Sequence, residues 1–258
     1  MDAVQVHVPF ALLFESHLAL FLQNRIHPEI TLSAEVLERF SLTDFKDIAA
    51  QLHEHELSIT LHAPFMDLSP GSLDPDVRAL TRRRFEQVLE LVPIFKPKTV
   101  VCHAGYDRKR YWPMRDAWIE NSLGVWSWFG AGVRDAGGRL MLENVYESSP
   151  EDIRILFERL TKQNVGFCLD SGHQAVFSTT SLEVWIKSLH PYLGQLHLHD
   201  NQGSKDDHLA LGQGKIDFHP IFNYLKSRKN EPPIITLEPH REEDLWLSIE
   251  YLESIRPL

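Results

Sequence analysis

Eight short runs of apolar and β-branched residues recur at a regular spacing along the chain, with helix-like segments between them. The runs lie at residues 4–8, 28–32, 57–63, 99–104, 139–145, 165–173, 194–200 and 233–239. Strands that alternate with helices indicate a parallel sheet covered by helices. The nearly continuous apolar character of the runs is typical of strands buried on both faces. The pattern therefore predicts an α/β fold.

The segments between the runs carry helix signals of their own. We predict helices over five of them, residues 17–24, 74–95, 115–137, 149–163 and 240–255. The start of the fourth is marked by Ser149 before Pro150, with Asp152 three residues after the serine, a variant of the capping box.

Eight strand–helix units in 258 residues match the size of a closed (β/α)8 barrel. An open, doubly wound sheet is the alternative, but it usually has fewer strands. Its glycine-rich phosphate-binding fingerprint is also absent after the first run. No low-complexity tract, linker or internal repeat interrupts the sequence. We therefore predict a single (β/α)8 TIM barrel domain over residues 1–258.

Composition excludes several classes of protein. A chain with 43% hydrophobic and 24% charged residues is typical of a soluble globular protein, and no stretch reaches the ~18 uninterrupted apolar residues of a membrane span. The start MDAVQVHVPF carries an acid where a signal peptide would be basic, and the two cysteines give no disulfide framework, so we expect a cytoplasmic location. The net charge of −10 argues against nonspecific nucleic-acid binding, although a local basic patch would still permit it. No pattern indicates an oligomeric state.

Six consecutive runs each end in a side chain that can ligate a metal. These side chains are His62, His103, Glu143, Asp170, His197 and Glu238, with His173 just beyond Asp170. In a (β/α)8 barrel the carboxyl ends of the strands converge on one mouth. Bare carboxylates gathered there would repel one another, and a bound cation removes this repulsion. The sequence therefore predicts a divalent-metal site at the mouth.

The loop over residues 196–214, LHLHDNQGSKDDHLALGQG, carries further candidate ligands. His199 shares a face with His197, and the loop then brings Asp206 and His208 back over the mouth. Asp207 is an alternative to Asp206. Two glycines near the end of the loop let the backbone turn tightly beside the site. We predict a lid that bears ligands.

Other polar residues have different predicted roles. Strand alternation predicts that Cys102 faces the outer helices and that Cys168 points into the barrel, one layer below the site, with packing roles for both. Four histidines match no ligand pattern and are expected to be surface or structural residues, namely His7, His190, His219 and His240.

A basic loop, DRKRYWPMR at residues 107–115, follows His103 directly. We predict that Arg108 contacts the substrate, and a solvated charged loop is the alternative. Phe65 and Met66, just past His62, would wall a sugar pocket or wedge into DNA.

In their order and spacing, these motifs resemble the xylose isomerase-like barrel superfamily, which holds sugar isomerases, ketose epimerases, inosose dehydratases and endonuclease IV. The resemblance covers nearly the whole chain. It rests on LHAP (61–64), VVCHAG (100–105), LEN (142–144), DSGH (170–173), HLHDN (197–201), DDHLALGQGKIDF (206–218) and TLEPH (236–240). The set is specific to the superfamily rather than to one activity.

The resemblance also implies roles for the site residues. Glu143, Asp170, His197 and Glu238 match the single-metal site of the epimerases and isomerases, in which Glu143 and Glu238 act as acid and base. His173 matches a histidine that contacts the substrate. The full nine-ligand pattern of endonuclease IV, which binds three zinc ions, matches His62, His103, Glu143, Asp170, His173, His197, Asp206, His208 and Glu238.

Charge separates the two mechanisms that the resemblance leaves open. One divalent ion among three carboxylates leaves the site with a net charge of about −1, which suits a neutral polyol. Three divalent ions with four carboxylates leave a net charge of about +2, which suits a phosphodiester. We favour a divalent-metal-dependent isomerase or epimerase that acts on a sugar, sugar phosphate or related polyol by proton transfer next to a carbonyl. The alternatives are a zinc-dependent, endonuclease IV-like phosphodiesterase acting on abasic DNA, and a non-catalytic, metal-dependent binding protein. The expected partner is a small-molecule sugar or polyol, and the expected cofactor is one to three ions of zinc, manganese or cobalt.

Overall fold

The computed structural model describes residues 4–228 and 231–255 and confirms the predicted (β/α)8 barrel. Its strands pair in parallel and in chain order, and β1 pairs with both β2 and β8, which closes the sheet. The strands are β1 (Val4–Pro9), β2 (His27–Thr31), β3 (Thr60–His62), β4 (Thr99–His103), β5 (Arg139–Glu143), β6 (Gly166–Asp170), β7 (Leu193–Leu198) and β8 (Ile234–Leu237). The closed order excludes the doubly wound alternative.

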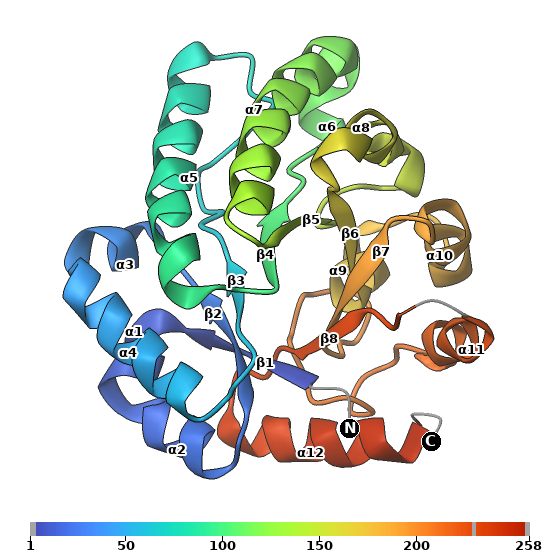
Figure 1. Ribbon diagram of the computed structural model, residues 1–258. Helices are drawn as coiled ribbons and strands as arrows, with labels where there is room; N and C mark the ends of the chain where they lie inside the picture. The colour runs from blue at the N-terminus through green and yellow to red at the C-terminus, as the bar shows by residue number, and fades with distance from the viewer. Residues whose placement is uncertain (1–3, 229–230, 256–258) are drawn as a thin grey trace.

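Helices surround the barrel (Figure 1). They are α1 (Phe10–Leu12), α2 (Leu18–Gln23), α3 (Ala34–Arg39), α4 (Leu42–Glu54), α5 (Pro75–Phe95), α6 (Arg108–Tyr111), α7 (Arg115–Asp135), α8 (Arg154–Arg159), α9 (Ser171–Phe177), α10 (Leu182–Leu189), α11 (His219–Ser227) and α12 (Glu242–Ile255). Within residues 4–228 and 231–255, no helix combines the length and the apolar character needed to cross a membrane. A cytoplasmic location stays a prediction.

The helix predictions agree with the structure except over residues 149–163. That segment is divided into a 3-10 turn at Pro150–Asp152, helix α8 and a second 3-10 turn at Thr161–Gln163. The predicted capping box is present, because Asp152 Oδ2 accepts the backbone N–H of Ser149 at 3.3 Å. The helix does not continue from it, because Ile153 leaves the helical region with φ −123°.

The main apolar core lies between the barrel and the helices, while a smaller cluster of Val101, Met141 and Cys168 fills the barrel interior. Cys102 belongs to the outer core, so the alternation predicted for both cysteines is confirmed. The interior also contains a layer of fully buried polar side chains, namely Gln5, Glu29, Thr60, Thr99, Gln195 and Thr236. Because side chains of one face recur every two residues, these side chains lie directly beneath the strand-end positions, except that of Thr99, which lies one step further down below Val101.

Two leucines of α12 provide a matched test of this packing. Leu245 is 3% exposed and Leu247 is 44% exposed. We expect Leu245→Ala to lower the free energy of unfolding by about 2 to 5 kcal/mol, since it leaves a cavity between helix and barrel. Leu247→Ala should change it by no more than about 0.5 kcal/mol. Urea denaturation of both variants measures the difference, and equal effects would contradict the placement of α12.

Candidate metal centre

The carboxyl ends of the strands bring the predicted ligands together around Glu143, the last residue of β5. Its Oε2 atom lies 3.1 Å from Nε2 of His62, 3.8 Å from Nε2 of His103 and 3.5 Å from Nδ1 of His197. Its other oxygen, Oε1, lies 3.1 Å from Nδ1 of His173. Glu143 is 1% exposed, so one buried carboxylate has imidazoles from four elements of the barrel around it.

Asp170 and Glu238 complete the inner group. Nδ1 of His197 lies 2.8 Å from Oε1 of Glu238, the residue that follows β8. Asp170 ends β6, and its Oδ1 accepts the backbone N–H of His173 at 2.6 Å, which caps helix α9 and holds His173 toward Glu143. The three carboxylates and His197 therefore converge on one volume.

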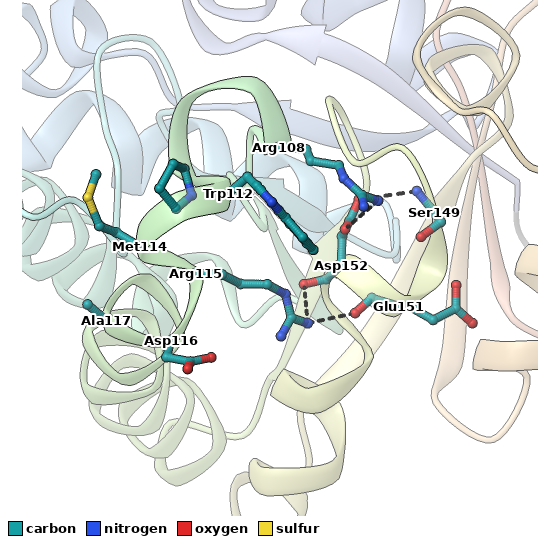
Figure 2. Close-up of a pocket in the computed structure, with 10 residues that line it drawn as sticks. Arg108, Trp112, Met114, Arg115, Asp116, Ala117, Ser149, Glu151 and Asp152 are labelled. Carbon is teal, nitrogen blue, oxygen red and sulfur yellow. Dashed lines mark hydrogen bonds and ion pairs between the residues drawn. The ribbon is translucent and has the colours of Figure 1, made fainter.

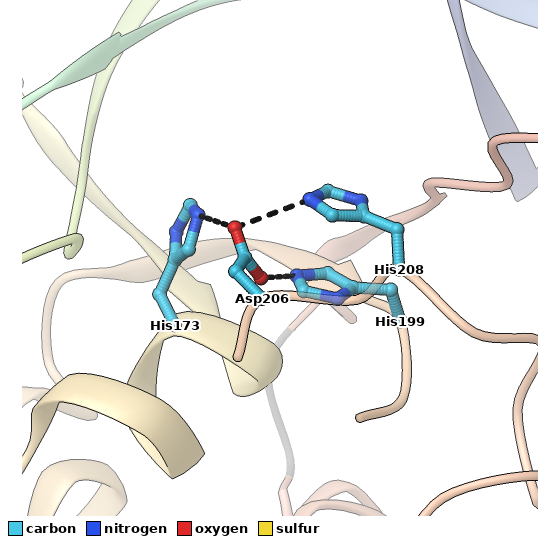
Figure 3. A group of neighbouring side chains, drawn as sticks. All are labelled: His173, His199, Asp206 and His208. Carbon is cyan, nitrogen blue, oxygen red and sulfur yellow. Dashed lines mark ion pairs between the residues drawn. The ribbon is translucent and has the colours of Figure 1, made fainter. Parts of the chain in front are cut away.

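A second group of donors lies above the first and includes residues of the 196–214 loop. Figure 3 shows Asp206 between His173 and His208, with His199 beside it. Oδ2 of Asp206 lies 3.2 Å from Nε2 of His173 and 3.3 Å from Nε2 of His208, and Oδ1 lies 3.6 Å from Nε2 of His199. Asp207 is exposed, so Asp206 is the loop aspartate that faces the site.

Asp200 holds this loop in place. The carboxylate is 1% exposed, and it accepts backbone N–H groups of Gly212 at 3.0 Å, Gly214 at 2.9 Å and Ile216 at 3.1 Å. A Cβ atom on Gly214 would lie 2.2 Å from Asp200 Oδ1, and Gly212 has φ +81°. The two glycines therefore let the chain close tightly around Asp200, which explains why the loop ends in them.

Electrostatics hold the carboxylates ionised and several imidazoles protonated. Burial by itself raises the pKa of Glu143 and of Glu238, but the imidazole of His197 lies against both and holds each pKa well below the ordinary value. Burial by itself lowers the pKa of His197 and of His173, but neighbouring groups, carboxylates among them, hold each pKa well above the ordinary value. Burial lowers the pKa of His103 to about 3. Because a metal binds the neutral imidazole, a divalent cation that binds here would displace the protons of His197 and His173.

Unpartnered polar atoms test whether these residues fit a metal ion. Eleven buried side-chain nitrogen and oxygen atoms of the described residues have no hydrogen-bond partner, and three of these atoms are Asp170 Oδ2, His197 Nδ1 and Asp206 Oδ1. An unpaired buried polar atom costs about 1 to 3 kcal/mol, so such atoms are uncommon unless an unseen partner satisfies them. All three belong to predicted ligands, and each can contribute one atom to a close group of metal donors. The residues present therefore fit a divalent cation.

The mouth opens into a cavity of about 660 Å³. Phe65, Met66, Tyr146 and Phe177 form an apolar side of its lining, and the ring of Phe65 stacks on His103 at 4.4 Å between centroids. His7 and His240 also line this cavity, and neither belongs to a close group of metal donors among the described residues. His190 and His219 are exposed, as expected.

Arg108 does not line this cavity, although it was predicted to contact the substrate. Figure 2 shows it in a neighbouring pocket, where its guanidinium lies 3.7 Å from Oδ1 of Asp152 and 4.5 Å from the ring of Trp112. Arg110, two residues further along, lines the mouth cavity instead. Both arginines lie on the short helix α6, and their side chains point to different pockets because residues two apart on a helix face nearly opposite sides.

Sequence reasoning did not identify Glu29 as part of the site. It lies on β2, is 0% exposed, and its Oε1 is 2.9 Å from Nε2 of His197. The available signal was a charged residue inside a run, PEITL, that was otherwise predicted to be buried on both faces.

Comparison with known proteins identifies a family for this chain and solved structures with the same barrel fold. Residues 28–255 match the family described as xylose isomerase-like TIM barrel. The structure is similar to the TTHB071 protein from Thermus thermophilus, in crystals soaked with ZnCl2, with 26% identity and a TM-score of 0.84 over 99% of this chain and 98% of that one. It is also similar to a D-tagatose 3-epimerase-like protein, with 25% identity and a TM-score of 0.78 over 97% and 96% of the two chains. The protein MJ1311 of Methanocaldococcus jannaschii is 29% identical over 78% of this chain and 70% of its own length.

The hydrogen bonds of Asp200 allow a test of whether this residue holds the loop in place. Asp200→Ala removes the acceptor of four backbone N–H groups, those of Asn201, Gly212, Gly214 and Ile216, and hydrogen bonds to a charged group are worth about 1.5 to 3 kcal/mol each. We expect amide hydrogen exchange over residues 201–216 to become at least about tenfold faster. The control Asp207→Ala changes an exposed aspartate of the same loop and should leave exchange unaltered. Equal protection in the two variants would refute the anchoring role.

Proposed function

We propose a function for this chain, which belongs to the xylose isomerase-like TIM barrel family: it is a divalent-metal-dependent isomerase or epimerase. Its substrate would be a sugar, sugar phosphate or related polyol, and the reaction would be proton transfer next to a carbonyl. The observation that carries the proposal is the pair of buried carboxylates, Glu143 and Glu238, that lie 3.5 Å and 2.8 Å from the same nitrogen of His197 at the floor of a large cavity. Similarity to a D-tagatose 3-epimerase-like protein supports it.

Glu143, Asp170, His197 and Glu238 would hold the ion, with zinc, manganese or cobalt as candidates. The four belong to overlapping groups of close donors, in which His197 lies with Glu143 and with Glu238, and Asp170 lies with Glu143 and with Glu238. When bound, a divalent ion would polarise the substrate carbonyl and stabilise the negative charge that develops next to it. The carboxylates would bind the ion through oxygen atoms, and His197 would bind it through Nδ1.

The two glutamates would carry the proton. Both are held ionised in the protein, so either can accept a proton from the carbon beside the carbonyl. They come from β5 and from the residue after β8, and two strands separate β5 from β8 in the closed barrel. The carboxylates therefore approach a substrate from different directions, and one can return the proton to the opposite face or to the neighbouring carbon. Burial of both keeps bulk water from competing for the proton.

Cavity walls indicate how a substrate would be held. His173 lies between Glu143 and Asp206 and lines the cavity, where its ring can contact a substrate. Phe65 and Tyr146 offer aromatic surface to the apolar face of a sugar ring. Arg110 brings a positive charge to the cavity and would bind a phosphate or carboxylate on the substrate.

The outer group of His173, Asp206 and His208 supports a second candidate function. Together with the inner group it brings all nine residues of the endonuclease IV-like pattern to one end of the barrel. Three bound zinc ions there would suit hydrolysis of a phosphodiester in abasic DNA. Its test is cleavage of an abasic-site duplex by the zinc-loaded protein.

Proton transfer has a direct signature in deuterated water. We expect the metal-loaded protein to exchange the hydrogen next to the carbonyl of its substrate for deuterium, as seen by NMR on a panel of ketoses, ketose phosphates and inososes. Glu143→Gln and Glu238→Gln should each lower the exchange rate by about 10²- to 10⁴-fold, because the amide cannot accept the proton.

Glu147→Gln is a matched control for these substitutions, since Glu147 is a buried carboxylate that accepts the backbone N–H groups of Val145 and Tyr106 and does not line the cavity. It should retain most of the exchange. If the protein cleaves abasic DNA and exchanges no hydrogen for deuterium in any sugar of the panel, the isomerase proposal is wrong and the phosphodiesterase is the better-supported function.

Substitutions of Arg110 and Arg108 test which arginine contacts an anionic substrate. If the substrate is anionic, Arg110→Gln should raise KM about tenfold or more, the equivalent of one charge-assisted hydrogen bond. Arg108→Gln changes an arginine of the neighbouring pocket and should leave KM unchanged. Steady-state kinetics on the best sugar phosphate compare the two, and the reverse order would restore Arg108 as the substrate contact.

A further inference from the structure

The proposed proton transfer does not explain why the barrel contains a layer of buried polar side chains, Glu29 among them, beneath the metal centre. Glu29 is 0% exposed inside the barrel, and no lysine or arginine of residues 4–228 and 231–255 forms an ion pair with it. A buried carboxylate is costly unless hydrogen bonds or a charged partner stabilise it. An apolar residue would fill the same space without that cost, so the carboxylate requires an explanation.

Hydroxyl and amide groups saturate one oxygen of this carboxylate. Oε2 of Glu29 accepts from Thr60 Oγ1 at 2.9 Å, from Thr236 Oγ1 at 3.1 Å and from the amide of Gln195. The amide of Gln195 is itself oriented, because its Oε1 accepts from Thr99 Oγ1 at 2.7 Å. Strands β2, β3, β7 and β8 thus hold the carboxylate rigidly, and Oε1 is left for another donor.

The remaining oxygen faces the imidazole of His197. Oε1 of Glu29 lies 2.9 Å from Nε2 of His197, and both side chains are 0% exposed. The other ring nitrogen, Nδ1, faces Oε1 of Glu238 at 2.8 Å and Oε2 of Glu143 at 3.5 Å. A neutral imidazole has one N–H donor and one lone pair, so the position of the proton decides which nitrogen can bind a metal.

We propose that Glu29 is a positioning residue of the metal centre: when a cation binds Nδ1 of His197 between Glu143 and Glu238, Glu29 accepts the proton that remains on Nε2. This inference rests on the metal site of the proposed function. Glu29 acts through His197 from the far side of the ring, and the hydrogen-bonded layer beneath it fixes the plane of the imidazole. Carboxylates that orient ligand histidines in this way typically change metal affinity by about 10- to 100-fold.

Glu29→Gln tests the proposal in the full-length protein. Oε2 of Glu29 accepts hydrogen bonds from Thr60, Thr236 and Gln195. The amide nitrogen of a glutamine at this position is a donor and cannot take the place of that oxygen. We expect the Kd for zinc, measured by competition with a chromophoric chelator, to rise by about 10- to 100-fold.

A second readout reports the position of the proton directly. In zinc-loaded protein labelled with ¹⁵N-histidine, His197 should be the Nε2–H tautomer with a strongly hydrogen-bonded proton in the wild type, and it should lose this signal in Glu29→Gln. Its signals are identified by their absence from His197→Ala. A residue that only filled space would not alter the tautomer.

Thr99→Val is the matched control. It removes a hydrogen bond from the same buried layer, because Thr99 donates to Gln195, but Thr99 forms no hydrogen bond with Glu29 or His197 in the described structure. Thermal denaturation should show that it destabilises the barrel, while the zinc Kd and the His197 tautomer stay near the wild-type values.

Three results would overturn the proposal. The first is an unchanged zinc Kd and tautomer in Glu29→Gln, and the second is an equal loss of affinity in Thr99→Val, which would indicate a general loosening of the barrel. The third is a zinc-loaded wild type in which His197 carries its proton on Nδ1. If the wild type binds no zinc, the proposed function fails on that measurement, whereas a wild type that binds zinc beside a Glu29→Gln variant of unchanged Kd and tautomer refutes only the role of Glu29.

Discussion

Burial of several carboxylates at one end of a closed barrel is the constraint on which the rest of the site depends. A parallel barrel directs the carboxyl ends of all its strands to one mouth, and here Glu143, Asp170 and Glu238 are each no more than 7% exposed. Mutual repulsion between buried carboxylates raises their pKa values if nothing opposes it. The imidazole of His197 opposes it at Glu143 and Glu238, and the unpartnered atoms of the predicted ligands fit a cation that would complete the balance.

Residues outside the ligand set give this centre its geometry. Asp200 closes the ligand-bearing loop, and Glu29 contacts His197 from below. Gly172 provides the space for His199, since a Cβ atom there would lie 1.9 Å from the imidazole ring. Each of these residues acts on the site through one defined contact, so its contribution can be separated from that of the ligands themselves.

Local patterns in the sequence were sufficient for the strands and for the residues at their ends, because burial on both faces and two-residue alternation are properties of each segment alone. They placed His62 and Glu238 at the mouth and Cys168 inside the barrel, in agreement with the structure. They could not identify Glu29, because its place in the site depends on contacts with β3, β7 and β8 that the barrel creates. They could not decide between Arg108 and Arg110 either, because the rotation of the short helix α6 determines which of the two arginines lines the mouth cavity.

The most direct test of the account is the metal content of the protein, measured by elemental mass spectrometry before and after reconstitution with zinc, manganese or cobalt. The account predicts at least one tightly held divalent ion per chain, and about one equivalent would favour the isomerase or epimerase. Three equivalents of zinc would favour the phosphodiesterase chemistry of the outer group. A chain that retains no metal after reconstitution would contradict the central claim that these buried carboxylates and imidazoles form a metal centre.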